Sequence, residues 1–475
     1  MHHPLIRFAP QRARLDRRTL LARSALAASA TFAMPAIHRS AAAQDATPGA
    51  TPAALGTASG TLVEWGFGTA ETNPLARSRV EAFQQAYPDV QLQVVESFDE
   101  QKLLTAAASD TVPDVIWLSR FETATWAARG VLQPLTDYIQ RDGFDTSVFY
   151  ESAIEESTWD GELYGIPGGM DVRALFINLD QLEAAGIDSS SIDTSDWDAL
   201  SEMGAKLVQK DGDVLKRWGF DHKYQARNFW MWGNGNGGHF MNDDATEATF
   251  NDGKNVEALD WGVKAYDAQG GYQAYQGLAT TWQGDEQFAR GQVAITLYEQ
   301  WMMSGPIATV APDLNFAVMP VRERGSGADG RMVSFTGGNS WYIPKGAKNP
   351  DAAWEFIKFL HSDATWRLGA EATKAYRDQQ GKPYLPALTG SRTADQLQID
   401  ELYEPIAGPF DAAVKLFPQI LEQSQNREIG RSPVAGQLED IMADSGVSPA
   451  LSGDASAQDA LDQANSDAQD AIDSF

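Results

Sequence analysis

The sequence predicts an α/β protein of two lobes, and three observations support this fold class. Its 475 residues exceed what one hydrophobic core holds, so two or three domains are expected. In the first third of the chain short apolar strands alternate with helices, which is typical of a mostly parallel sheet covered on both faces. The stretch 161–180 has the composition of a segment that leaves one lobe and enters another.

That stretch combines a rigid point, a flexible point and a strand. Pro167 fixes its own backbone angle, whereas Gly168 and Gly169 leave the backbone free to turn. Residues 174–177 then read as a short buried strand. Asp171 follows the glycines directly, so its carboxylate is expected at the mouth between the lobes. The alternative is an ordinary loop that enters a strand.

The remaining elements follow from caps and periodicity. Asn73 and Pro74 stand in the order of a helix cap and a first helical residue, and Asn349 and Pro350 repeat that order. Gly291 is expected to end a helix just before a strand. The expected strands are 61–65, 90–95, 114–118, 293–295 and 315–320. The expected helices are 74–87, 98–109, 122–129, 194–210, 255–269 and 351–361.

The amino terminus differs in composition from the rest. Arginines precede an apolar run that is too short and too polar to span a bilayer. The residues Asp16 to Leu21, with Arg17 and Arg18, resemble a twin-arginine export signal, and the small residues 41–43 form a cleavage site before Gln44. The alternative is an ordinary secretory signal with a chance arginine pair. Residues 1–43 are therefore expected to be a signal peptide and residues 44–60 a disordered spacer.

Composition excludes several classes of protein. The net charge of −28 argues against nucleic acid and anionic membrane surfaces as partners. The chain has no cysteine, which excludes disulfides, thiolate zinc sites and a cysteine-linked lipid anchor. We therefore expect an exported protein, periplasmic or extracellular, without a lipid anchor, cofactor or metal.

Enzymatic motifs are sparse. The glycines 233–238 have the spacing of a dinucleotide-binding loop, but no clear strand precedes them and no helix follows. Only three histidines follow the signal peptide, far apart in sequence. The acidic pairs Glu155-Glu156 and Asp243-Asp244 leave a glycoside hydrolase open as an alternative.

Tryptophan is the most informative residue type. The chain has 14 tryptophans, and many stand beside predicted loops and strand ends. An indole face packs against the C–H face of a sugar ring while carboxylates and amides bind its hydroxyl groups. About half of these tryptophans are expected in cores instead.

Four segments in the same order resemble the extracellular solute-binding proteins of ABC importers, the family that includes maltodextrin-binding proteins. These are the crossing stretch, in which Ile177-Asn178 replaces a usual Tyr-Asn; residues 288–301, in which Glu299 replaces a usual glycine; residues 336–360; and the C-terminal helix 456–473. The resemblance implies a type II periplasmic-binding fold, with a ligand cleft between lobes joined by a hinge. Lobe one is expected to comprise 61–167 and 315–365, and lobe two 168–314 and 366–475.

The resemblance also implies a function and a site. The chain is expected to be a monomeric, non-enzymatic binding protein that closes on a sugar, oligosaccharide or polyol and delivers it to permease subunits. The expected hinge residues are Pro167, Gly168 and Gly169. The expected ligand-binding residues are Trp65, Phe67, Ser119, Glu122, Asp171, Trp230, Trp232, Trp282, Glu299, Trp301, Gly338 and Asn339. Glu122, Asp171 and Glu299 also leave open a polyamine or another organic cation as the ligand.

Overall fold

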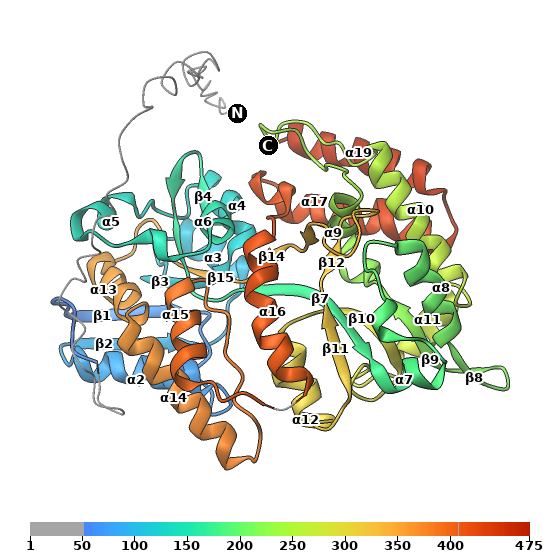
Figure 1. The fold of residues 1–475 in the computed structure, drawn as a ribbon. Helices are drawn as coiled ribbons and strands as arrows, with labels where there is room; N and C mark the ends of the chain where they lie inside the picture. The colour runs from blue at the N-terminus through green and yellow to red at the C-terminus, as the bar shows by residue number, and fades with distance from the viewer. Residues whose placement is uncertain (1–51, 407) are drawn as a thin grey trace, which may run out of the picture. The chain divides into compact units, whose positions relative to one another are not determined.

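The computed structural model describes residues 52–406 and 408–475 (Figure 1). The predicted signal peptide, with Arg17 and Arg18, and the first part of the predicted spacer lie outside the described residues. In the described part of the chain, no helix has both the length and the apolar character that a membrane span requires.

The first sheet has five strands in the order β2-β1-β3-β15-β6, and its first three strands are parallel. Helices cover both faces, because side chains of α2 and α13 pack in one apolar cluster and those of α3 and α4 in another. Asn73 caps α2 as predicted, since its Oδ1 accepts a hydrogen bond from the backbone N–H of Ala76. The strands are β1 (Gly60–Trp65), β2 (Val90–Val95), β3 (Val115–Ser119), β6 (Gly165–Pro167) and β15 (Asn339–Tyr342). The helices are α2 (Pro74–Ala86), α3 (Glu100–Ala108), α4 (Thr123–Ala128) and α13 (Pro350–Leu360).

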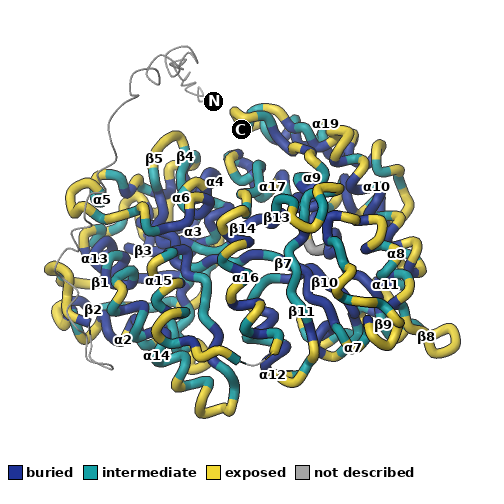
Figure 2. Tube along the Cα trace, in the orientation of Figure 1, coloured by how far each residue is buried: buried dark blue, intermediate teal, exposed yellow. Residues whose placement is uncertain are grey.

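The second sheet is built around β7 (Asp171–Asn178), which pairs antiparallel with β10, β11 and β14. One face packs on a core that includes side chains of α8, α10 and α19, and the other face packs on α16. Strands β7 and β10 are largely buried, whereas β8 at the edge is exposed (Figure 2). The other strands are β8 (Gln209–Asp211), β9 (Val214–Asp221), β10 (Val293–Glu299), β11 (Phe316–Met319) and β14 (Thr336–Gly337). The helices are α8 (Trp197–Leu207), α9 (Phe229–Gly235), α10 (Gly253–Asp267), α16 (Pro409–Gln423) and α19 (Ala457–Asp473).

Two boundaries between the lobes differ from the prediction. Strand β11 pairs with β7, so 316–319 belong to the second sheet and not to lobe one. Helix α14 (Asp363–Gln379) packs against α2 of lobe one, although 366–475 were expected in lobe two. Figure 1 shows α13 and α14, in orange, beside the blue elements β1 and α2. Apolar patterns predict that β11 and α14 are buried. Which sheet each of them packs against depends on residues far away in the sequence.

Two local predictions are also wrong. Part of the expected disordered spacer packs on lobe one, where the backbone N–H of Leu55 donates to the Tyr87 hydroxyl at 2.9 Å. No helix ends at Gly291, because residues 287–291 form a turn in which Gly291 has a φ of +71°. That backbone conformation suits glycine in a turn as well as in a helix cap, which explains the misassignment.

Candidate functional site

The chain passes between the two sheets at 167–171 and again at 336–339. The first passage leads from β6 to β7, and the second from β14 to β15. The two segments touch, since the backbone N–H of Gly168 donates to the carbonyl oxygen of Asn339 at 3.1 Å. These two segments are called the crossover below.

The buried side chain of Arg120 holds the crossover together. Its Nη1 donates to the carbonyl oxygens of Gly169, at 2.6 Å, and Asn339, at 3.1 Å, and its Nη2 donates to that of Gly337, at 2.5 Å. Its Nε donates to Glu156 Oε2 at 3.2 Å. One side chain from the end of β3 therefore binds both connecting segments.

The crossover glycines are explained by close packing. A Cβ at Gly168 would lie 2.6 Å from the Trp117 ring, and one at Gly338 would lie 2.1 Å from the carbonyl oxygen of Gly169. Gly338 also has a φ of +124°, which other residues rarely adopt. These positions need glycine in this conformation, whether or not the backbone turns there.

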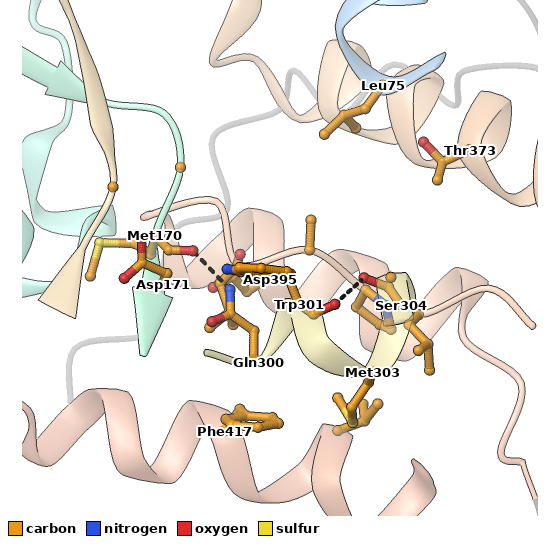
Figure 3. Close-up of a pocket in the computed structure, with 18 of the residues that line it drawn as sticks. Leu75, Met170, Asp171, Gln300, Trp301, Met303, Ser304, Thr373, Asp395 and Phe417 are labelled. Atoms are coloured by element: carbon orange, nitrogen blue, oxygen red, sulfur yellow. Dashed lines mark hydrogen bonds between the residues drawn. The ribbon is translucent and has the colours of Figure 1, made fainter. Parts of the chain in front are cut away.

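A pocket with a volume of about 580 Å³ lies beside the crossover. We call it the crossover pocket. It is lined by the start of α2, the crossover, the segment that follows β10, residues 385–388, and parts of α14 and α16. In Figure 3, Leu75 and Thr373 lie on the opposite side of the pocket from Gln300, Trp301 and Ser304. Elements that pack on both sheets therefore meet at one concave site, where a ligand would contact both lobes.

Four of the predicted ligand-binding residues line this pocket, together with the predicted hinge residue Gly169. They are Asp171, Trp301, Gly338 and Asn339. Trp301 is 40% exposed, and its ring meets Tyr298 edge-on with centroids 5.0 Å apart. An indole that is held at one edge and open to the pocket is suited to pack against a ligand.

The Asp171 carboxylate is paired within the protein. It forms an ion pair with Arg173, whose Nη2 lies 3.0 Å from Glu299 Oε1. The Arg173 guanidinium also stacks 3.9 Å above the Phe335 ring. Glu299, predicted to bind ligand, is instead a partner of Arg173 and does not line the crossover pocket.

Three predicted tryptophans of lobe two do not line this pocket. Trp230 and Trp232 are 1% and 0% exposed in the core of lobe two, so neither ring has a face open to a ligand. Trp232 instead packs against Trp197 and Trp261, with ring centroids 4.9 and 5.0 Å away. Trp282 packs against the same core and meets Tyr275 edge-on. In this structure Trp230 and Trp232 are therefore core residues, and their role in ligand binding stays a prediction.

The predicted residues of lobe one that precede the crossover, Trp65, Phe67, Ser119 and Glu122, also lie outside the pocket. Trp65 is buried under Lys102, whose Nζ lies 4.0 Å from the ring centroid. Phe67 is buried against other aromatic rings, and Ser119 lies opposite Asn339 in the pairing of β3 with β15. Glu122 faces Gly436 of α17 (Ala435–Ile441), and burial raises its pKa to about 7.

Sequence reasoning missed several residues that line the pocket. Trp117 Nε1 donates to the Asn339 side chain at 2.7 Å when that amide is oriented to suit its neighbours. Gln300 bridges the crossover, because it donates to the carbonyl oxygen of Met170 at 3.0 Å and accepts from the N–H of Val172 at 2.9 Å. Alternation of side chains along β3 predicts that Trp117 points to the opposite face of the sheet from its sequence neighbours. It does not predict which of the two faces contacts the crossover. No signal placed α14 at the pocket, because its contact with lobe one is long-range.

A second pocket, with a volume of about 1040 Å³, is lined by members of the other motifs, among them Glu155, Glu156, Asn234, His239 and Asp243. The glycines 233–238 pack closely, since a Cβ at Gly238 would lie 2.1 Å from Asn255 Oδ1. Within the described ranges, no cluster of three or more histidine, aspartate and glutamate side chains is arranged to hold a metal ion.

Known proteins match this chain in sequence. A putative binding protein of Brucella abortus is 26% identical over 313 residues, which is 63% of this chain and 71% of the relative. The lactose-binding protein of Rhizobium radiobacter is 22% identical over 61% of this chain and 67% of its own. The diacetylchitobiose binding protein of Streptomyces coelicolor is 28% identical over 56% of this chain and 60% of its own length.

Solved structures match the fold. A mannobiose-bound protein, CpMnBP1, superimposes with a TM-score of 0.64 at 23% identity, covering 86% of this chain and 99% of its own. The substrate-binding protein Lmo0181 of Listeria monocytogenes, in complex with cycloalternan, gives a TM-score of 0.69 at 21% identity. The match covers 88% of this chain and 100% of that protein. These likenesses confirm the predicted type II periplasmic-binding fold.

The family model for bacterial extracellular solute-binding proteins matches residues 78–405, well over half of the chain. This range includes both crossover segments and most of both sheets. The chain therefore belongs to the bacterial extracellular solute-binding protein family.

Proposed function

We propose that this protein captures a sugar, oligosaccharide or polyol in the crossover pocket and delivers it to the permease of an ABC importer. The observation that supports this most directly is the position of Trp301, an exposed indole at a pocket whose lining comes from both lobes. The relatives named for lactose and diacetylchitobiose support the same class of ligand.

The lining suits a carbohydrate chemically. Trp301, Trp117 and Tyr376 offer aromatic surface for the apolar faces of sugar rings. Asn73, Gln300 and Ser304 offer amide and hydroxyl groups for the hydroxyls of a sugar. A ligand held between the two lobes would favour the closed arrangement by the difference in its affinity for the two states.

The two alternatives receive less support. An organic cation needs free carboxylates, but Asp171 and Glu299 both pair with Arg173. A glycoside hydrolase needs a pair of available acids. Glu156 is instead buried against Arg120, and Glu155 accepts a hydrogen bond from Asn426.

We further propose that the protein is exported folded through Arg17 and Arg18, and that it acts as a monomer, without a lipid anchor or catalytic activity. Membership of an extracellular family supports export. The outer surfaces of both lobes are proposed to contact the permease subunits when the lobes are closed.

A combined experiment tests the proposal. Thermal shift is measured against panels of oligosaccharides, polyols and polyamines, and turnover is measured on chromogenic glycosides. A saccharide that raises the melting temperature should also reduce the radius of gyration in small-angle scattering. Stabilisation by polyamines alone, or turnover of a glycoside, would contradict the proposal.

A further inference from the structure

Among the described residues that line the crossover pocket, one side chain is cationic, Arg377 of α14. Every other lining residue is neutral or acidic, and the two acids are Asp171 and Asp395. In a chain with a net charge of −28, a lone arginine at the proposed ligand site calls for a physical explanation.

Arg377 has no acidic partner, in contrast to the other cations on its helix. Arg367 pairs with Glu401, and Lys374 Nζ lies 2.6 Å from Glu404 Oε1. Arg377 Nε donates to the carbonyl oxygen of Pro383 at 3.0 Å, and its Nη2 is buried without an acceptor. Nη1 is not one of the enclosed nitrogens that lack a partner, and among the described residues no carboxylate forms an ion pair with the group.

The acids of the pocket do not compensate this charge. Asp171 is paired with Arg173. Asp395 is buried, and its Oδ1 accepts two hydrogen bonds of 2.7 Å from the N–H and the hydroxyl of Thr389. Burial raises the pKa of Asp395 to about 7, which reduces its negative charge near neutral pH.

Desolvation of an unpaired guanidinium is unfavourable, and it lowers the pKa of Arg377. Nη1 is not enclosed in the way that Nη2 is, and an anionic ligand in the pocket would supply a partner for it. A hydrogen bond between a guanidinium and a carboxylate is charge-assisted, and it is shorter and stronger than a bond between neutral groups.

We propose that the natural ligand is an acidic saccharide, and that Arg377 binds the carboxylate of its uronate residue. This inference rests on the proposed function and names the class of ligand. Tyr376 and Trp301 line the same pocket and would contact the sugar rings.

Calorimetric titration tests the inference with di- and trisaccharides that contain glucuronate, galacturonate or mannuronate, each beside its uncharged methyl ester. The wild-type protein should prefer at least one acid to its ester. Arg377→Gln should weaken binding of that acid by about ten- to a hundredfold and weaken binding of the ester much less, since the ester accepts a hydrogen bond but carries no charge. Arg377→Lys should have an intermediate effect, because a lysine keeps the charge without the planar fork.

Arg367→Gln is the matched control on the same helix and should leave both affinities unchanged. Melting temperatures of all variants separate loss of binding from loss of folding. Equal affinity for acid and ester, or equal losses for both in Arg377→Gln, would overturn the inference and leave the proposed function intact. Binding of no saccharide, acidic or neutral, in the wild-type protein would remove both.

Discussion

Arg120 Nε donates to Glu156 Oε2 at 3.2 Å, and both side chains are almost completely buried. The rest of the Arg120 guanidinium binds backbone carbonyls of both crossover segments. Glu156 compensates the positive charge of Arg120, whose other hydrogen-bond partners are uncharged. The pair therefore fixes the relative position of the two connections between the sheets.

Breaking this pair should destabilise the protein strongly. Arg120→Met leaves Glu156 buried without this partner and removes a hydrogen bond from each of three backbone carbonyls, and we expect a loss of about 3–5 kcal/mol in the free energy of unfolding. Urea denaturation measures this loss. The double variant R120M/E156Q should lose less than the sum of the single losses, and Arg77→Met, at an exposed pair with Glu81, should change stability by less than about 1 kcal/mol. Additive losses for Arg120 and Glu156 would contradict the coupling.

Trp301 and Trp232 provide a matched pair of tryptophans. Trp301→Ala should weaken ligand binding by about ten- to a thousandfold with little change in melting temperature, because truncation of a binding anchor costs about 2–4 kcal/mol. Trp232→Ala should cost about 3–5 kcal/mol of stability, because it leaves a cavity in a closed core. Calorimetric titration and thermal melts on both variants measure the two quantities. A sharp fall in the melting temperature of Trp301→Ala, with unchanged affinity in the folded fraction, would assign that ring to a core.

Asp171→Ala should weaken binding by about ten- to a hundredfold in a folded protein, because it removes a charged acceptor at the pocket and releases Arg173. Titration with the best saccharide from the screen measures the effect. Asp188→Ala, at an exposed turn that does not line the pocket, serves as the control. Wild-type affinity in a stable Asp171→Ala protein would exclude this carboxylate from binding.

Stability should depend on pH through Glu64. Burial raises the pKa of Glu64 from 4.5 to about 8, so the folded state keeps a proton that the unfolded chain releases above about pH 4.5. The free energy of unfolding should therefore decline from about pH 4.5 to about pH 8 by this contribution. Denaturation curves across this range should show that Glu64→Gln gains stability relative to the wild-type protein as the pH rises. The side chain of Glu71 is 92% exposed, so Glu71→Gln should show no such gain. A difference in stability between Glu64→Gln and the wild-type protein that does not change with pH would contradict the assignment.

Export should depend on the arginine pair. Changing Arg17 and Arg18 to lysine should retain the precursor in the cytoplasm, as fractionation and immunoblotting would show. Normal export of the double variant would favour an ordinary secretory signal. N-terminal sequencing of the exported protein should begin at Gln44.

Local and periodic signals were sufficient for much of the fold. The parallel strands β1, β2 and β3, the cap at Asn73 and the position of Asp171 at the start of β7 follow from patterns within a few residues. Such patterns report backbone preference and burial, which neighbouring residues largely determine. The sequence by itself therefore determined the α/β class, the point of crossing and one carboxylate of the pocket.

Only the tertiary structure decided which aromatic residues are open to a ligand. Trp232 and Trp301 both follow apolar segments, yet one is enclosed by Trp197 and Trp261 and the other faces the crossover pocket. It also decided that Glu299 pairs with Arg173 and that Arg377, some 200 residues after Asp171, lines the same pocket. The physical reason is that exposure and pairing depend on contacts between segments distant in sequence, which no local pattern encodes.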